Sequence, residues 1–274
     1  MPENGRSPRR AVVLPILGYA TILAFFLFAY WKKGGGHTRA LMYASIGFPK
    51  GRAALPMFYA GVSRQERGLS PRDACPEDRV ADGLFCQEGY FFSVYTRFLQ
   101  KTLRDRARQG SQESSAQIEI VGAETPIKMV AVGMAAAHES VSPADIRFRD
   151  VGHIKYFYDG YGAGLQFTLG HAEKRIVELC AETPYRIYCE FGAGRASYFL
   201  GLAHGKGHGK ARNHPQLLLG QQFAAVLSGD VVPAEPTRVQ RLALEWRTHG
   251  SVSSDYRCSE RKDRHIVDCL SSPR

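Results

Sequence analysis

Five polar and aromatic side chains near the middle of the chain are of types that hold small charged groups: Tyr158, Asp159, Tyr161, Glu190 and Arg195. A guanidinium among tyrosines and small residues suits a carboxylate or a phosphate, because it donates parallel hydrogen bonds to such a group. These residues predict an aromatic-lined groove. The competing interpretation is an ordinary helical core with Arg195 as an exposed charge, and the sequence favours that interpretation.

Three histidines lie in a glycine-rich basic segment: His204, His208 and His214. Imidazole nitrogens bind transition metals, so these side chains are candidate metal ligands. The glycines on both sides of His208 leave the ligands without preorganisation, and no carboxylate lies in the segment. A flexible basic loop explains the segment better, and the sequence predicts no cofactor.

Common catalytic motifs are absent from the sequence: it contains no G-x-S-x-G, no H-E-x-x-H and no phosphate-binding G-x-x-x-x-G-K-[ST]. Gly162 and Gly164 resemble part of a dinucleotide fingerprint, but this fingerprint follows an apolar strand, and residues 154–159 make a poor strand. The sequence therefore leaves enzyme activity undecided, leans toward a binding role and assigns no catalytic residue.

The six cysteines form three pairs that are close in sequence: Cys75 and Cys86, Cys180 and Cys189, Cys258 and Cys269. Local, even pairing of this kind is typical of disulfides in an oxidising compartment. None of the pairs has the short spacing of a zinc ribbon, so metal ligation is the weaker interpretation. The pairs predict three disulfides and a domain outside the cytoplasm.

The amino-terminal region contains an apolar run, Ala11 to Trp31, that has no charged residue. Its 21 residues would span roughly 30 Å as a helix, which is the thickness of the hydrocarbon core of a membrane. The run predicts an uncleaved anchor in the inner membrane, and a cleaved signal peptide is the alternative. Residues 1–10 would then be a cytoplasmic tail, residues 32–39 a flexible joint, and the remaining chain periplasmic.

Glycines recur along the rest of the chain at intervals of 28 to 30 residues, with one interval of 44: Gly61, Gly89, Gly133, Gly162, Gly192 and Gly220. Recurrence at this period is typical of stacked repeat proteins. Glycine inside a helix costs about 0.5–1 kcal/mol relative to alanine, and close approach of a neighbouring helix would offset this cost. The sequence therefore predicts a mainly α fold, with a helical repeat domain over residues 40–247 and these glycines at packing positions.

Several individual elements are also predicted. Four Ser-Pro or Thr-Pro pairs are typical of helix starts, because the hydroxyl caps the helix and proline suits its first turn. They begin at Ser70, Thr125, Ser142 and Thr183.

Hydrophobic periodicity predicts helices over residues 85–108, 126–138, 217–227 and 237–246, and alternation predicts a short strand over residues 117–121. In the predicted helix at 85–108, one face is apolar and holds Phe91, Tyr95, Phe98 and Leu99. Residues 248–274 are interpreted as a polar tail pinned by the third disulfide.

Three segments carry a resemblance to a known family: Glu88-Gly-Tyr-Phe91, Asp159-Gly-Tyr-Gly162 and Gly192-Ala-Gly-Arg-Ala-Ser-Tyr-Phe199. They are similar to repeated segments in a family of unassigned function that is associated with bacterial enediyne biosynthesis gene clusters. The resemblance covers roughly residues 85–230. It implies a shared fold and no catalytic residues, and the predicted anchor and cysteine pairs depart from the family pattern.

The formal net charge of +10 favours acidic partners, but the basic residues are scattered, which argues against nucleic acid. The leading functional prediction is a membrane-anchored helical-repeat scaffold or binding protein that meets an envelope protein or an acidic surface. The alternative is an accessory enzyme or a protein that handles lipids or small molecules, with a pocket at the predicted groove.

Overall fold

The computed structural model describes residues 54–75, 80–109, 117–149, 151–170, 172–200, 214–229, 231–249 and 265–271. These residues belong to one compact unit that spans Phe48 to Arg274, and they are mainly helical, which confirms the mainly α part of the predicted fold. The predicted anchor, Ala11 to Trp31, and the joint at 32–39 lie outside them. Within the described ranges, no helix is both long enough and apolar enough to cross a membrane.

The first three described helices pack together: α3 (Ala54–Glu66), α4 (Pro71–Ala74) and α5 (Val80–Gln109). The helix predicted over residues 85–108 forms the greater part of α5. Its inner face holds Tyr95 and Leu99 as expected, but Phe98 is 41% exposed. Phe98 therefore lies at the edge of the predicted face, since it is rotated by about 100° around the helix from Leu99.

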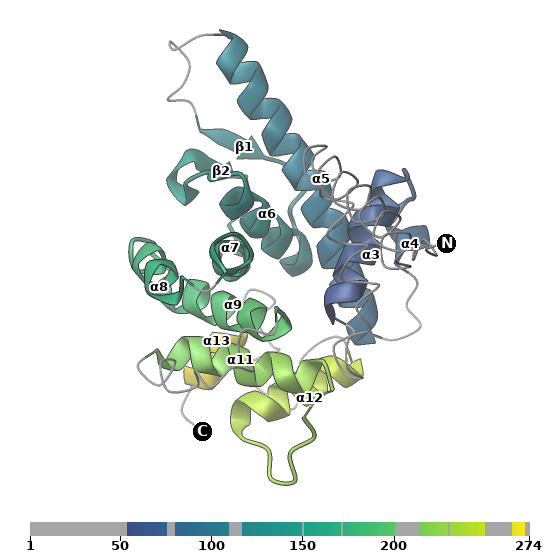
Figure 1. Cartoon of the computed structure of the whole chain (residues 1–274), viewed down its shortest axis with the longest axis vertical. Coiled ribbons are helices and arrows are strands. Elements are labelled where there is room, and N and C mark those ends of the chain that lie inside the picture. Colours follow the sequence, from purple (N-terminus) through teal and green to yellow (C-terminus); the bar gives the residue numbers. More distant parts are fainter. Residues whose placement is uncertain are drawn as a thin grey trace, which may run out of the picture. The chain divides into compact units, whose positions relative to one another are not determined.

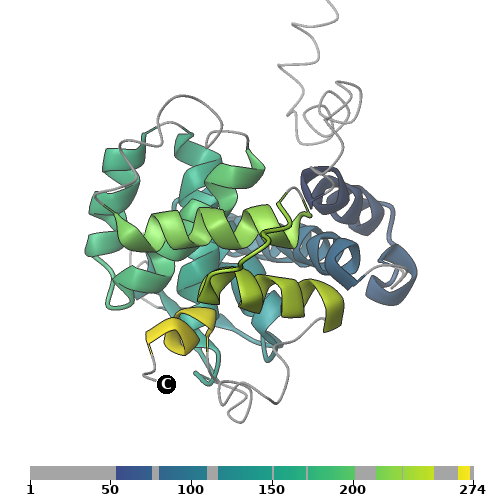
Figure 2. The ribbon, with the colours of Figure 1, turned by 90° about the horizontal axis from the view of Figure 1, so that it is seen from below.

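Four further helices pack one against the next in chain order: α6 (Pro126–His138), α7 (Ile154–Leu169), α9 (Arg186–Phe199) and α11 (Pro215–Leu227). Figure 1 shows this succession from α6 through α7 and α9 to α11. The short helix α8 (Glu173–Ala181) packs on α7 and α9, and α12 (Arg238–His249) runs beside α11 (Figure 2). The segment at 154–159, considered above as a poor strand, is the first part of α7.

Two short strands complete the described fold. The predicted strand is β1 (Ile118–Ile120), and it pairs in parallel with β2 (Ile146–Phe148), which follows a 3-10 turn at Pro143–Asp145. Ile118, Ile120 and Ile146 are buried and belong to the main hydrophobic core. The strand pair thus closes the core beside α6 and α7.

Three of the four predicted caps are present: Ser70, Thr125 and Ser142 each accept a backbone hydrogen bond at the start of a helical segment. The fourth prediction, at Thr183, was wrong. The Thr183 hydroxyl instead donates to the carbonyl of Cys180 at 2.8 Å, and the next helix begins three residues later, at Arg186. Thr183 therefore belongs to the turn that follows α8, where its hydroxyl satisfies a carbonyl at the end of that helix.

The recurring glycines lie where pairs of helices cross. A Cβ atom built on Gly162 would lie 1.8 Å from the carbonyl oxygen of Cys189, and one on Gly192 would lie 1.8 Å from that of Asp159. Gly162 and Gly192 thus form a reciprocal pair: each packs against the backbone carbonyl of the residue three positions before the other glycine. The same reciprocal arrangement joins three further pairs: Gly61 with Gly89, Gly133 with Gly160, and Gly194 with Gly220. The helix backbones touch at all four crossings, which leaves no room for a side chain.

Two of the three predicted disulfides are confirmed, between Cys75 and Cys86 and between Cys180 and Cys189. Cys258 lies outside the described residues, so the third pair remains a prediction. The two confirmed bonds indicate an oxidising environment.

Removing the second disulfide tests its contribution to stability. The double variant Cys180→Ala/Cys189→Ala is expected to lose about 3 kcal/mol of unfolding free energy, because a loop of this size would no longer be closed in the unfolded chain. Urea denaturation of the variant and of the wild-type protein measures the difference. Equal midpoints and slopes for the two proteins would contradict the expectation.

The carboxyl-terminal region corrects the predicted boundary at residue 248. Helix α12 continues to His249, and α13 (Ile266–Ser271) packs on α9 and α12. His265 is fully buried, and Val267 is 1% exposed. The segment 265–271 therefore packs on the core, because Ile266, Val267 and Leu270 give this short helix an apolar face.

Candidate functional site

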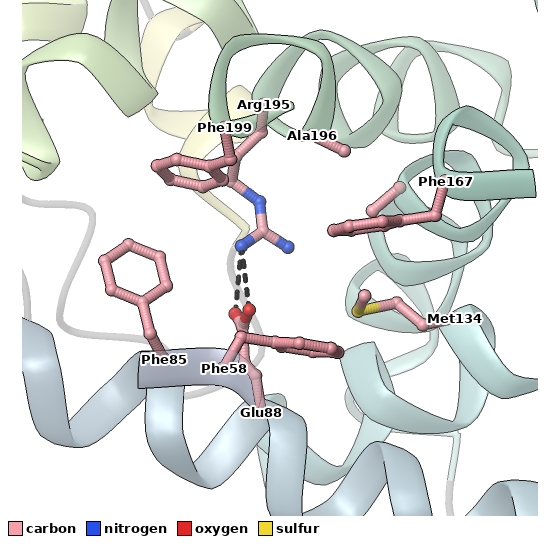
Figure 3. Close-up of a pocket in the computed structure, with 9 residues that line it drawn as sticks. Phe58, Phe85, Glu88, Met134, Phe167, Arg195, Ala196 and Phe199 are labelled. Carbon is pink, nitrogen blue, oxygen red and sulfur yellow. Dashed lines mark hydrogen bonds and ion pairs between the residues drawn. The ribbon is translucent and has the colours of Figure 1, made fainter. Parts of the chain in front are cut away.

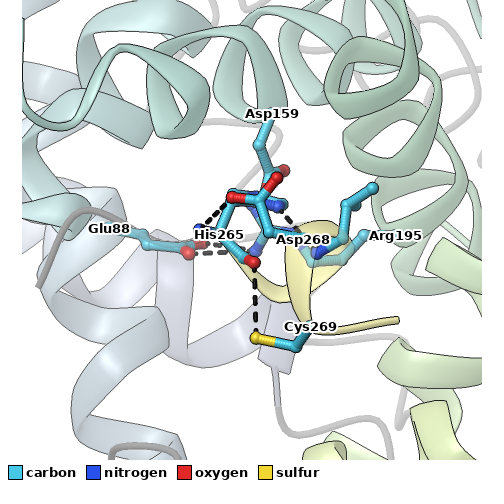
Figure 4. A network of polar contacts seen from close by, with 7 residues as sticks. Glu88, Asp159, Arg195, His265, Asp268 and Cys269 are labelled. Atoms are coloured by element: carbon cyan, nitrogen blue, oxygen red, sulfur yellow. Dashed lines mark hydrogen bonds and ion pairs between the residues drawn. The ribbon is translucent and has the colours of Figure 1, made fainter. Parts of the chain in front are cut away.

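A buried polar network joins four segments of the fold: α5, α7, α9 and the residue that precedes α13. Arg195 Nη1 donates to both carboxylate oxygens of Glu88, at 2.9 and 3.2 Å, and its Nη2 donates to Asp159 Oδ1 at 3.2 Å. Asp159 Oδ2 lies 3.0 Å from His265 Nε2. Figure 4 shows the four side chains converging. Glu88 and Arg195 are 107 residues apart in sequence, so only the tertiary fold brings them together.

The glycine crossings position two members of this network. A Cβ atom on Gly192 would lie 2.6 Å from Asp159 Oδ1, the oxygen that binds Arg195, and one on Gly220 would lie 2.8 Å from the backbone nitrogen of Arg195. Because Gly192 has no side chain, the Asp159 carboxylate has room beside it. Because Gly220 has no side chain, α9, the helix that carries Arg195, can pack closely against α11.

His265 is held at both ring nitrogens. The backbone N–H of Val267 donates to Nδ1 at 3.2 Å, which assigns the ring proton to Nε2, where it is donated to Asp159. The ring also packs against Tyr156, Tyr188 and Phe191, with centroids 4.7, 5.1 and 5.5 Å away. His265 is fully buried, and both of its ring nitrogens have partners within the protein. The aspartate–histidine pair is therefore a structural link.

Asp268 makes a second set of contacts around the same segment. It accepts hydrogen bonds from Lys155 Nζ at 2.8 Å, from the Tyr188 hydroxyl and from the backbone N–H of His265 at 3.0 Å. These contacts attach α13 to α7 and α9. Burial raises the pKa of Asp268, but its hydrogen bonds to Lys155, Tyr188 and His265 outweigh burial and hold the pKa below its usual value.

The lowered pKa gives Asp268 a predictable effect on acid stability. A carboxylate whose pKa is lower in the folded protein stabilises the fold above its unfolded pKa, near 3.8, and loses that contribution as pH falls through the folded value. Asp268→Asn is expected to cost about 1–2 kcal/mol at pH 7 and close to nothing in strong acid. Urea denaturation at pH 7 and pH 2 checks this, with exposed Asp145→Asn as the control. A cost that does not change with pH would contradict the expectation.

Three of the four side chains in the central network have shifted pKa values. Burial raises the pKa of Glu88, and the neighbouring Arg195 opposes this effect without cancelling it. Burial also acts to raise the pKa of Asp159, but Arg195 and His265 together outweigh it, so that pKa is lowered. The two carboxylates raise the pKa of Arg195 above its usual value in spite of burial, which keeps the guanidinium charged.

Two cavities meet at the Glu88–Arg195 pair. The first, the phenylalanine cavity, is lined by Phe58, Phe85, Phe167 and Phe199, together with Met134, Ala163 and Ala196. Figure 3 shows Glu88 and Arg195 pointing at each other from opposite walls, with Phe85 and Phe199 on one side and Phe167 and Met134 on the other.

The second cavity lies on the side of Asp159. Its lining is again mostly apolar, and includes Val130, Tyr156, Phe191, Trp246 and Ile266. Phe85, Glu88 and Arg195 line both cavities. The arrangement, apolar walls with a few converging polar groups, is typical of sites for small molecules.

The residues predicted to form a groove are divided between different places. Asp159 and Arg195 meet in the network. Tyr158 instead packs on Tyr185 with ring centroids 4.9 Å apart, and Glu190 pairs with Arg186 at 2.6 Å. Tyr161 lies near the ring of Phe157, with centroids 6.3 Å apart, and burial raises its pKa. Tyr158, Tyr161 and Glu190 are absent from the linings of both cavities described here. The competing interpretation from the sequence treated Arg195 as an exposed charge. That interpretation was wrong on this point, because the Arg195 side chain is only 7% exposed.

Sequence reasoning left out Glu88 and His265. A signal for Glu88 was present, because Glu88-Gly89-Tyr90 repeats the acid–glycine–tyrosine order of Asp159-Gly160-Tyr161. Both acids precede a glycine at a helix crossing, and both reach Arg195. His265 carries no such signal, since the residues before it are polar and its partner is 106 positions away.

The candidate metal ligands are only partly placed. His204 and His208 lie outside the described residues, and His214 precedes α11 without a side-chain capping bond. In the part of the chain that the structure describes, no three His, Cys, Asp or Glu side chains are grouped so as to hold a metal ion.

Searches against protein-family models, curated proteins and solved structures found no match to this chain. The resemblance to the enediyne-associated family therefore remains a prediction from the sequence.

Proposed function

We propose that the protein binds a small, largely apolar molecule in the cavities at the Glu88–Arg195 pair. The observation that carries the proposal is the meeting of two apolar cavities at a buried ion pair contributed by distant segments. Burying such charges costs several kcal/mol per ion before pairing, and a purely structural core of apolar residues would avoid that cost. Polar groups held in apolar walls give a ligand both affinity and orientation.

The proposed location is the outer face of the inner membrane, with Ala11 to Trp31 as the anchor. The two disulfides support a compartment outside the cytoplasm, and the net charge of +10 suits contact with an acidic envelope surface. Apolar molecules partition into membranes, so an anchored binding domain would meet its ligand there.

Filling the phenylalanine cavity tests the proposed function. Ala196 lines this cavity and is 2% exposed, so Ala196→Leu is expected to weaken binding of the neutral fluorescent probe N-phenyl-1-naphthylamine at least tenfold. The readout is the saturable fluorescence increase of the full chain. The control is Ala144→Leu at an exposed site, measured in the same preparation to remove membrane background. Equal binding by both variants, or no saturable binding by the wild-type protein, would overturn the proposal.

A scaffold built from helical repeats is a second candidate. It is supported by the four reciprocal glycine crossings, which share one geometry and follow one another along the chain. We propose that these helix pairs are the units of the repeat predicted from the glycine spacing. Crosslinking in native membranes is expected to yield a defined envelope partner if the scaffold role holds. Recovery of the protein without any crosslinked partner would count against it.

A further inference from the structure

The two cavities are lined by more negative than positive groups. Among the described residues that line them, the acidic and basic side chains are Glu88, Asp159 and Arg195. His265 contacts Asp159 through Nε2 and accepts the backbone N–H of Val267 at Nδ1. Two carboxylates thus share one guanidinium, and the Lys155–Asp268 pair beside them is neutral as a pair. When its carboxylates are ionised, the site has a surplus of one negative charge.

The surplus charge belongs to Glu88. Asp159 is satisfied on one oxygen by Arg195 and on the other by His265. Within the described residues, Glu88 makes hydrogen bonds to Arg195 Nη1 alone, which leaves lone pairs on both of its oxygens unused. Its side chain is 15% exposed, whereas that of Arg195 is 7% exposed. Glu88 therefore faces the cavities with a carboxylate that is only partly neutralised.

The walls around Glu88 suit a cation. Phe85 and Phe199 pack edge to face with centroids 4.9 Å apart, and Phe58 and Phe167 stack at 5.7 Å. These two ring pairs surround the ion pair in Figure 3. The faces of aromatic rings attract alkylammonium groups, and the attraction is strongest where water is excluded. A carboxylate within a ring of phenylalanines offers a cation both a counter-charge and apolar contact.

From this arrangement we infer that the ligand is an apolar amine, protonated or quaternary, whose positive charge lies against Glu88 within the phenylalanine cavity. This inference rests on the proposed function and names its ligand class. Arg195 Nε favours a different ligand, one with a hydrogen-bond acceptor, because it is a buried donor that has no partner in the described structure. An unsatisfied donor costs about 1–3 kcal/mol, whereas an unpaired buried charge costs more. The surplus charge therefore decides the ligand class, and a neutral acceptor is the alternative that the experiment must exclude.

Three water-soluble probes with the same phenylethyl group separate these chemistries: phenethylamine, 2-phenylethanol and 3-phenylpropanoate. Calorimetric titration of the full chain at pH 7 is expected to show phenethylamine binding at least tenfold more tightly than the alcohol, a difference of about 1.4 kcal/mol. The carboxylate is expected to show no measurable binding, because it would meet a site that already has an excess of negative charge.

Glu88→Gln tests the residue assignment. The change keeps the size of the side chain and removes its charge, so the affinity for phenethylamine is expected to fall to that for the alcohol. Glu119→Gln, at an exposed position, is the matched control and should keep the wild-type preference. Equal affinities of the wild-type protein for amine and alcohol, or tighter binding of the carboxylate, would overturn the inference while leaving the proposed function intact. Binding of none of the three, with N-phenyl-1-naphthylamine still bound, would also overturn it; loss of that probe as well would overturn both proposals.

Discussion

Replacing Arg195 with methionine is expected to lower the free energy of unfolding by about 3–5 kcal/mol at pH 7, among the largest effects of any single substitution in the protein. The change keeps the length and apolar stem of the side chain but leaves Glu88 and Asp159 buried without their shared counter-charge. Breaking a buried ion pair from one side has a cost of this size, because the remaining charge stays uncompensated. Urea denaturation monitored by circular dichroism measures the loss.

The cause of that loss can be isolated with a compensated variant. In Glu88→Gln/Asp159→Asn/Arg195→Met all three charges are removed together, and most of the lost stability is expected to return. Protonation should act in the same direction, because burial already raises the pKa of Glu88. The single variant is therefore expected to be closest to the wild-type protein at acidic pH and furthest from it at neutral pH. If the triple variant is as unstable as Arg195→Met, the loss comes from packing and not from charge.

Gly192→Ala is expected to lower the free energy of unfolding by about 3 kcal/mol, although alanine is the better helix former by roughly 1 kcal/mol. The added methyl group would lie 1.8 Å from the carbonyl oxygen of Asp159, so α7 and α9 must move apart. For a unit of this size the loss corresponds to a fall of roughly 6–12 °C in melting temperature. Because the crossing also holds the carboxylate of Asp159, probe binding should weaken as well.

Gly68→Ala is the matched control for this prediction. Gly68 has a φ of 78°, and a Cβ atom added there would have no other atom within 4 Å, so alanine meets backbone strain and no neighbour. Its expected cost is about 1 kcal/mol. Similar melting temperatures for the two variants would show that the helix crossing is not the tight contact described above.

Local features of the fold were predicted well from the sequence. The helix at Pro126–His138 was placed at the observed bounds, because a threonine cap and a proline mark its first turn. Two disulfides followed from cysteines nine and eleven positions apart, since short loops limit the choice of partner. Glycine spacing indicated close helix packing, although it did not show which helices cross. Whether the crossings derive from a true sequence repeat stays a prediction.

The candidate site was predicted only in part, for a physical reason. Asp159 and Arg195 were predicted as site residues because each is a charged residue within a run of glycine, alanine and aromatic residues. Glu88 and His265 reach them across 107 and 106 positions, and such contacts depend on how helices pack, which local pattern does not encode. Tyr158 and Glu190 contact other partners, Tyr185 and Arg186, because neighbours in sequence on α7 and α9 point to different sides of a helix.

A crystal structure of the full chain with 4-bromophenethylamine would show whether a ligand binds beside Glu88. Bromine scatters anomalously, so its position can be located without reference to the protein atoms. We expect one bromine peak inside the cavity formed by Phe58, Phe85, Phe167 and Phe199, with the amine nitrogen within hydrogen-bonding distance of Glu88. A bromine peak on the protein surface alone, or an empty cavity at saturating amine, would rule out binding of the amine at this position.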